Sequence, residues 1–197
     1  MNTYKVQKRD METKAKKLRR EGFVTGNLFG KEIKESIPLK IERKEAERLL
    51  RECMKGSQVL LDLEGTTYDV LVKEMDYNSM KNEIMEMDFQ ALVKGEKVHS
   101  VAEVVLVNHE KVQSGVVEQK LEEIAYKALP EALVETVEVD LSGLKPGDVV
   151  KVKDLAIAAD KDVVLSTDPD TVVVTVTVPH NAPIPEAEDA DEEAAEK

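Results

Sequence analysis

Short segments in which apolar and polar residues alternate recur along the chain, and they predict strands. In the N-terminal half, "TYKVQKR" places Tyr4 and Val6 on one face, and "EIMEMDFQALV" alternates from Met85 to Val93. A period of two buries one face of a strand. Beyond residue 97 the apolar residues are mostly valine, in segments separated by turn signals at "SGLKPGD" and "TDPDT". The pattern therefore predicts a mainly β protein.

One helix and one hairpin are also predicted in the N-terminal half. "ERKEAERLLRECMKG" places Ala46, Leu49, Leu50 and Cys53 on one stripe, which is typical of an amphipathic helix. Because Cys53 lies on that apolar stripe, we expect a small core residue and not a nucleophile. "SQVLLDLEGTTYDVLVKE" indicates two strands joined by a tight turn at Glu64-Gly65.

Glycine and proline give two further expectations. Gly22, Gly26 and Gly30 recur at four-residue spacing, which favours a folded loop over a helix. "ESIPLKI" has the alternation of a strand but contains Pro38, which cannot donate a backbone hydrogen bond. Proline is tolerated mainly at the edges of sheets, so this segment is expected to be an edge strand.

The chain is long enough for two ordinary domains, and composition indicates where they divide. Residues 1–94 are predicted to form a domain of strands with at least one helix, and "KGEK" (94–97) is a candidate hinge. Residues 95–185 are predicted to form an all-β C-terminal domain. Residues 186–197 belong to a final "PEAEDADEEAAEK" that has no large apolar residue, so we expect a disordered acidic tail.

Charge is distributed unevenly along the chain, whose formal net charge is -12. Residues 1–51 carry 15 Lys/Arg against 8 Asp/Glu, whereas residues 95–197 carry 9 against 23. The single cysteine excludes a disulfide framework, and the chain has neither a signal-peptide-like start nor an apolar run long enough to span a membrane. We therefore expect a soluble cytoplasmic protein that is monomeric when free and has no membrane partner.

Catalytic and metal-binding chemistry find little support in the residues. His99, His109 and His180 share no ligand-like spacing with one another or with Cys53, and no phosphate-binding loop, dinucleotide fingerprint or nucleophile elbow is present. His99 and His109 are expected to be surface or edge-strand residues. We therefore expect no enzyme activity, no cofactor and no metal site.

A concentrated basic run is the strongest sign of a binding function. "KAKKLRR" has five basic side chains in seven positions, and Lys8 and Arg9 come just before it. Such a run can neutralise phosphates and release condensed counterions, which makes affinity salt-dependent. The alternative is a solvated surface. With aromatic residues at 4% of the chain, nucleic-acid contacts would depend on charge and shape more than on stacking.

Three motifs resemble the bacterial large-subunit ribosomal protein L-twenty-five family, in its long general-stress (Ctc) form. "KAKKLRREGFVTGNLFG" (14–30) is similar to the family's N-terminal basic motif, and "VLVKEMDYNSMKNEIMEMDFQAL" (70–92) is similar to its second motif. "VEVDLSGLKPGDVVKVKDL" (137–155) resembles a stretch of its C-terminal domain. The resemblance implies an N-terminal β-barrel that binds 5S ribosomal RNA in the large subunit, followed by a second β domain.

Carried over residue by residue, the resemblance implies RNA contacts at Arg9, Lys17, Arg19, Phe29 and Asp88. Together with the rest of the basic run, the candidate RNA-binding residues are Arg9, Lys14, Lys16, Lys17, Arg19, Arg20, Phe29 and Asp88.

Several positions depart from the family pattern. Phe29 replaces a tyrosine and lacks its hydroxyl, and Lys17 replaces an arginine and lacks the bidentate fork. "DYNS" (76–79) stands where Gln-Arg-His-Pro is usual, and Glu86 replaces a histidine.

Two hypotheses follow. In the first, the chain is a ribosomal protein that docks on 5S RNA. In the second, it is a divergent stress-related paralogue that binds RNA weakly or not at all and acts as a protein-interaction module.

Overall fold

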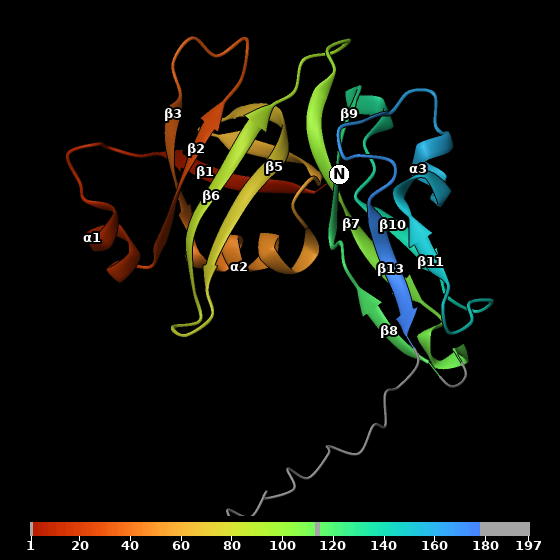
Figure 1. Ribbon diagram of the computed structural model, residues 1–197. Coiled ribbons are helices and arrows are strands. Elements are labelled where there is room, and N and C mark those ends of the chain that lie inside the picture. The colour runs from red at the N-terminus through yellow and green to blue at the C-terminus, as the bar shows by residue number, and fades with distance from the viewer. Residues whose placement is uncertain (1, 113–114, 178–197) are drawn as a thin grey trace, which may run out of the picture.

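The computed structural model describes residues 2–112 and 115–177, and within them the protein is mainly β, as predicted. Six strands form a closed barrel with the order β1-β3-β2-β6-β5-β4 (Figure 1). Two short helices accompany the barrel. In chain order these elements are β1 (Thr3–Lys8), α1 (Ala15–Arg20), β2 (Phe23–Phe29), β3 (Ile37–Glu42), α2 (Arg43–Glu52), β4 (Gln58–Leu63), β5 (Thr66–Asn78) and β6 (Glu83–Ala91).

Two parallel pairings distinguish this barrel from a simple meander. β1 pairs in parallel with β4, which closes the barrel, and β2 pairs in parallel with β6. The inward side chains of the strands form one apolar core, in which Leu28, Met87 and Phe89 are fully buried. At Gly26 the backbones of β2 and β6 approach so closely that a Cβ would collide with the Met87 carbonyl oxygen. A side chain at this inward position would push β2 away from β6.

The predicted amphipathic helix is confirmed as α2, which packs on the barrel through Ala46 and Leu49. Cys53 follows the helix and is buried in the core, as expected. The Tyr4 hydroxyl lies 3.3 Å from Cys53 Sγ and donates to Glu52 Oε2 at 2.8 Å. Burial, together with these two contacts, raises the pKa of Tyr4. This cluster connects β1 to the end of α2.

The predicted hairpin at Glu64-Gly65 is confirmed, because β4 and β5 pair in antiparallel register around that turn. Both turn residues have positive φ, at 52° and 92°, as a tight two-residue turn requires.

Two expectations based on single residue types are wrong. The glycine-spaced segment is the strand β2 and not a folded loop, because Gly26 is needed where the strand approaches β6. β3 is not an edge strand, because it pairs with both β1 and β2. Pro38 is compatible with that central place because it lies where β1 ends. Its carbonyl accepts a hydrogen bond from the Arg9 backbone N–H at 2.8 Å, just beyond β1, and the nitrogen and carbonyl of one residue face the same neighbouring strand. The nitrogen that cannot donate therefore faces the end of β1 and not β2.

Beyond the barrel the chain forms two smaller sheets with the orders β10-β7-β9-β12 and β11-β13-β8. Their apolar side chains form a second core around Ile124, Tyr126 and Val173. The Tyr126 hydroxyl donates to the carbonyl oxygen of Val134 at 2.7 Å and accepts from its backbone N–H at 2.8 Å, which satisfies the buried hydroxyl. The elements are β7 (Val98–Val107), η1 (His109–Lys111), β8 (Val116–Gln119), β9 (Glu123–Ala128), η2 (Pro130–Ala132), β10 (Thr136–Asp140), β11 (Val149–Lys151), η3 (Val152–Asp154), α3 (Ala156–Ala159), β12 (Val164–Leu165) and β13 (Val172–Thr177).

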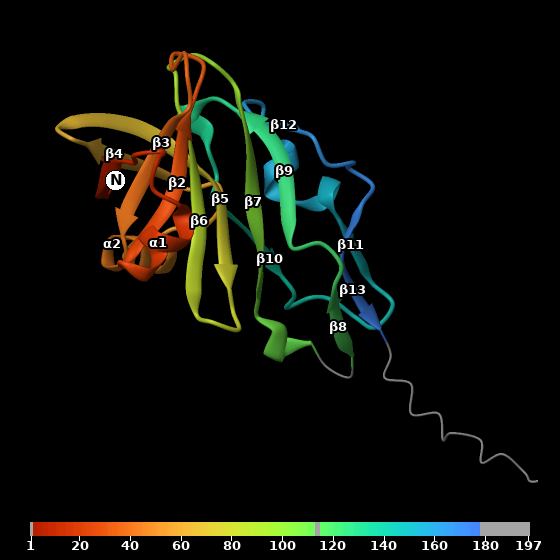
Figure 2. The same ribbon diagram turned by 90° about the vertical axis from the view of Figure 1, so that its left-hand side faces the viewer.

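The barrel contacts the rest of the chain where the loop before β4 approaches β7. Gly56, at φ 91°, lies so close to β7 that a Cβ would collide with the Val101 carbonyl oxygen. Lys73 Nζ donates to the His99 carbonyl oxygen at 2.8 Å, on the same side of the barrel. α1 lies on the side of the barrel away from the second core (Figures 1 and 2).

The proposed hinge at 94–97 lies between β6 and β7, and the division of the chain there stays a prediction. The predicted acidic tail, residues 186–197, lies outside the described residues. Within the described part of the chain, no helix is long and apolar enough to cross a membrane.

Candidate RNA interface

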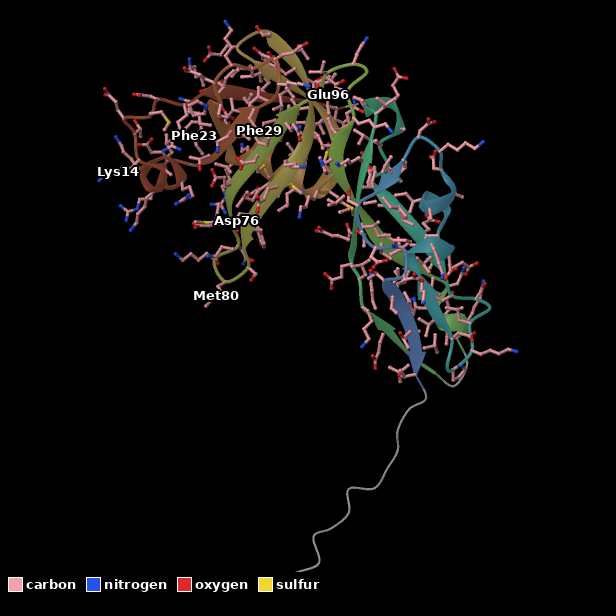
Figure 3. The ribbon with its side chains drawn as sticks, turned by 45° about the horizontal axis from the view of Figure 1, so that its top comes forward. Lys14, Phe23, Phe29, Asp76, Met80 and Glu96 are labelled. Carbon is pink, nitrogen blue, oxygen red and sulfur yellow. The ribbon has the colours of Figure 1, made fainter. Side chains whose placement is uncertain are left out.

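The basic run forms the short helix α1, which stands at one end of the molecule, where Figure 3 labels Lys14. Leu18 is the buried residue of this helix, which packs beside β2. The helix ends before Gly22, whose φ of 89° reverses the chain at low cost. Four of the five basic side chains are exposed, and they are Lys14, Lys16, Lys17 and Arg20. These four predicted residues therefore share one exposed cationic surface.

Arg9 is placed differently from the residues of α1. It is half-buried, and its Nη2 donates to the Thr13 carbonyl oxygen at 3.1 Å. Its Nε is buried and has no partner among the described residues. Arg9 therefore holds the loop that leads from β1 into α1.

Arg19 joins α1 to the barrel wall. Its Nη1 donates to the Met85 carbonyl oxygen at 3.3 Å, and the Thr25 hydroxyl donates to the same oxygen at 3.3 Å. The pairing of β2 with β6 begins at Thr25 and Glu86, so Met85 lies just before the paired segment of β6. The start of this pairing thus provides the attachment point for the basic helix.

The outward side chains of β2 and β6 form ordered rows next to this attachment point. In the parallel register Thr25 lies opposite Glu86, and Asn27 lies opposite Asp88. Asp88 Oδ1 accepts hydrogen bonds from both the backbone N–H and the side-chain Nδ2 of Asn27, each at 3.1 Å. Asn27 Nδ2 also donates to Glu86 Oε1 at 3.2 Å. These bonds orient the Asp88 carboxylate and leave its second oxygen as an acceptor for a ligand.

The same face continues onto β5 as an acidic groove. Glu74 lies opposite Asp88, and Asp76 lies opposite Glu86, across the antiparallel β5–β6 pair. The four carboxylates line a hollow of about 170 Å³. No group of three or more His, Cys, Asp or Glu side chains in residues 2–112 and 115–177 is arranged to hold a metal ion. The groove is therefore a region of negative potential beside a cationic helix.

Phe29 lies on the same outer face of β2 as Asn27, two residues further along the strand. It is half-buried and lies opposite Gln90 of β6. Figure 3 shows Phe29 on the barrel and Asp76 nearer the tip of the β5–β6 hairpin. The structure thus places Phe29 and Asp88 on one face and connects that face to α1 through Arg19.

Asn27 is a candidate functional residue that sequence reasoning missed. It orients Asp88 and bridges to Glu86, but its position in a glycine-spaced segment led to the expectation of a loop. The available signal was its spacing from Phe29, because residues two apart on a strand share a face.

The described histidines are surface residues. His99 and His109 are exposed, although His99 lies on β7, which is an internal strand of its sheet. Desolvation, with contributions from Lys127 and Lys73, lowers the pKa of His99. His180 lies outside the described residues.

Comparisons with known proteins match this chain along most of its length. Residues 5–89 match the family model described as the Ribosomal L25p family, and residues 97–180 match the model described as ribosomal protein TL5, C-terminal domain. The protein named large ribosomal subunit protein bL25 from Thermoanaerobacter sp. (strain X514) is 33% identical over 172 residues, which cover 85% of this chain and 84% of that protein.

Proteins of the same name from two other bacteria are similar. The one from Bacillus velezensis is 31% identical over 166 residues, covering 83% of this chain and 81% of that protein. The one from Listeria monocytogenes serotype 4b is 31% identical over 197 residues, covering 98% of this chain and 94% of that protein.

Proposed function

Because this chain belongs to the ribosomal L25p family, we propose that it is a large-subunit ribosomal protein whose N-terminal barrel binds 5S rRNA. The observation that carries the proposal is the Arg19–Met85 hydrogen bond, which holds the basic helix against the outer face that presents Asp88. A cationic surface and an oriented acceptor are thereby fixed side by side. The proposal makes the protein ribosome-associated, cytoplasmic and monomeric when free.

In this proposal α1 contacts the phosphate backbone. Phosphate contacts do not read the base sequence of the RNA, but they supply affinity because they release counterions. The exposed residues of α1 that would make these contacts are Lys14, Lys16, Lys17 and Arg20. Lys17 also lies 3.8 Å from Glu21, and this exposed pair is weak enough for a phosphate to displace the carboxylate.

The outer face of β2 and β6 contacts the shallow groove of the RNA. An A-form helix displays ribose hydroxyls and base edges in a wide minor groove, whereas its major groove is too deep and narrow for side chains. The free oxygen of Asp88 can accept from a ribose hydroxyl or a base amino group. Phe29 can pack against a sugar or a base but cannot donate a hydrogen bond.

Arg9 contributes to this interface by its support of the loop before α1, which places the helix relative to β1.

A second candidate function is supported by the acidic groove. Glu74, Asp76 and Glu86 surround Asp88 and repel phosphates that approach this face. In this second function the chain is a stress-related paralogue that has lost affinity for RNA and acts as a protein-interaction module. Repulsion of phosphates by the groove would not impair such a function.

One binding experiment separates the two functions. The full chain is titrated with a 5S rRNA fragment and with an unrelated hairpin of the same length, each at two salt concentrations. The ribosomal function requires tighter binding to the 5S fragment at both concentrations. Equal affinity for the two RNAs favours the interaction module.

A further inference from the structure

A second hollow of the barrel domain is unrelated to the acidic groove. It is a cleft of about 410 Å³ between the start of β2, helix α2 and the β5–β6 hairpin, which lie toward the same end of the barrel in Figures 1 and 2. Val24, Leu50 and Ile84 provide apolar lining, and the first and last of these are buried in the barrel core. Its volume is in the range of small-ligand sites.

Three arginines line this cleft, and α2 and the hairpin hold two of them in place. Arg43 Nε donates to Glu47 Oε1 at 2.9 Å, and Arg43 Nη2 donates to the Asn82 carbonyl oxygen at 3.3 Å. Arg51 Nε donates to the Glu47 carbonyl oxygen at 3.3 Å. The two Nη atoms of Arg51 make no hydrogen bond within the described residues, so they remain available to a ligand. The third arginine is Arg19.

Two aromatic side chains also line the cleft. Tyr77 is 44% exposed, although its hydroxyl donates to Asn82 Oδ1 at 3.0 Å. Phe23 lies at the start of β2, with Lys40 Nζ 5.4 Å from its ring centroid. Exposed aromatic rings beside guanidinium groups are the surfaces on which unpaired bases stack.

We propose that this cleft holds one unpaired nucleotide of the RNA bound by α1. The inference rests on the proposed RNA-binding function. It adds that the bound RNA has a bulged or looped-out base. Arg19 carries the connection, because it lines the cleft and also attaches α1 to the Met85 carbonyl oxygen. A strand whose phosphates follow α1 therefore passes the mouth of the cleft.

The polar lining fits a base better than it fits an acidic peptide. Glu47 and Glu83 add two carboxylates to a cleft that three arginines make cationic. These carboxylates repel an acidic peptide, but they can accept hydrogen bonds from base amino and imino groups while the arginines contact the phosphate. The mixture of donors, acceptors and aromatic rings matches the edges and faces of a nucleobase.

The test uses two hairpin fragments of 5S rRNA that are identical apart from one bulged nucleotide, and it measures the ratio of their dissociation constants by fluorescence anisotropy. For the parent chain the bulged hairpin is expected to bind at least about five-fold tighter, the lower end of what stacking of one base contributes. Tyr77→Ala and Arg51→Ala are each expected to bring the ratio close to one. Lys44→Ala removes the same charge as Arg51→Ala from an exposed site on α2 outside the cleft, and it is expected to keep the parent ratio.

Failure of this inference can be told apart from failure of the proposed function. Equal binding of the two hairpins by the parent, or an unchanged ratio in both cleft variants, overturns the nucleotide site and leaves RNA binding by α1 in place. Absence of binding to either hairpin overturns both. The nucleotide site is also overturned, in favour of a protein partner, if the NMR signals of Tyr77 move with an acidic peptide and not with the bulged RNA.

Discussion

Arg19 on α1 and Met85 on β6 are 66 residues apart in the chain, and a 3.3 Å hydrogen bond joins the Arg19 guanidinium to the Met85 carbonyl oxygen. Of the five basic residues in the run, Arg19 is the half-buried one. It therefore positions the cationic helix in addition to carrying charge.

Replacement of Arg19 should weaken RNA binding more than replacement of its neighbour. Arg19→Ala and Arg20→Ala remove the same charge, but the first also removes a charged hydrogen bond, which is worth about 1.5–3 kcal/mol. We expect Arg19→Ala to raise the Kd for the 5S fragment about ten-fold more than Arg20→Ala does, measured by fluorescence anisotropy. Equal losses in the two variants would assign Arg19 to charge alone.

The exposed lysines of α1 should determine the salt dependence. The double variant Lys16→Ala with Lys17→Ala removes two phosphate contacts, and each contact contributes about 0.7–0.9 to the slope of log K against log salt. We expect that slope to flatten by about 1.4–1.8. Lys111→Ala with Lys145→Ala, at exposed sites beyond the barrel, serves as the charge-matched control and should leave the slope unchanged. A parent-like slope in the α1 variant would remove these lysines from the interface.

The carboxylate of Glu86 should oppose RNA binding. It lies in the acidic groove beside Asp88, and a carboxylate near a phosphate costs about 1 kcal/mol where water screens the pair. Glu86→His and Glu86→Gln should therefore lower the Kd for the 5S fragment about five-fold. Glu138→Gln, on the exposed side of β10, provides the control for net charge. Weaker binding by both Glu86 variants would mean that this carboxylate accepts a hydrogen bond from the RNA.

Gly56 should be much less tolerant of a side chain than Gly65. Both have φ near 90°, which costs an L-residue about 1–2 kcal/mol, but only at Gly56 would a Cβ also collide with a backbone carbonyl oxygen. We expect Gly56→Ala to lower the free energy of unfolding by at least about 1 kcal/mol more than Gly65→Ala, since crowding of this kind typically costs 1–3 kcal/mol. Urea denaturation measures both, and equal losses would show that the chain relaxes at the contact with Val101.

Tyr4 should make the protein less stable at alkaline pH. Burial and the contacts with Cys53 and Glu52 raise the pKa of its hydroxyl, so above about pH 10 the unfolded chain loses this proton while the folded protein keeps it. The free energy of unfolding should therefore fall as pH rises past that value. Tyr4→Phe should lose about 1 kcal/mol at neutral pH and show a shallower alkaline decline in urea titrations. An identical decline in parent and variant would exclude Tyr4 as its source.

Local patterns in the sequence predicted those elements that depend on local physics. The hairpin at Glu64-Gly65 follows from a turn that needs positive φ at both positions, and α2 follows from a single apolar stripe. The position of Cys53 followed from the same stripe. None of these features requires knowledge of which strands pair.

Which strands pair within the barrel is what the local sequence patterns did not predict. Pro38 would mark an edge in an open sheet, but in the closed barrel it lies where β1 ends, and its carbonyl accepts the Arg9 N–H just beyond that strand. Asn27 was missed for the same reason, because its bonds to Asp88 depend on the parallel register of β2 with β6. Register between distant strands has no signature in either segment alone.

Parallel pairing of β2 with β6 also decides when the proposed RNA-binding surface can exist during synthesis. A growing polypeptide releases the basic helix well before β6, because residues such as Asn27 and Asp88 are 61 positions apart. Contacts between distant segments form only after the later segment is available. A nascent chain that ends before β6 therefore carries the full cationic charge of α1 but lacks the wall that orients it, and so it can attract nucleic acids without discriminating among them.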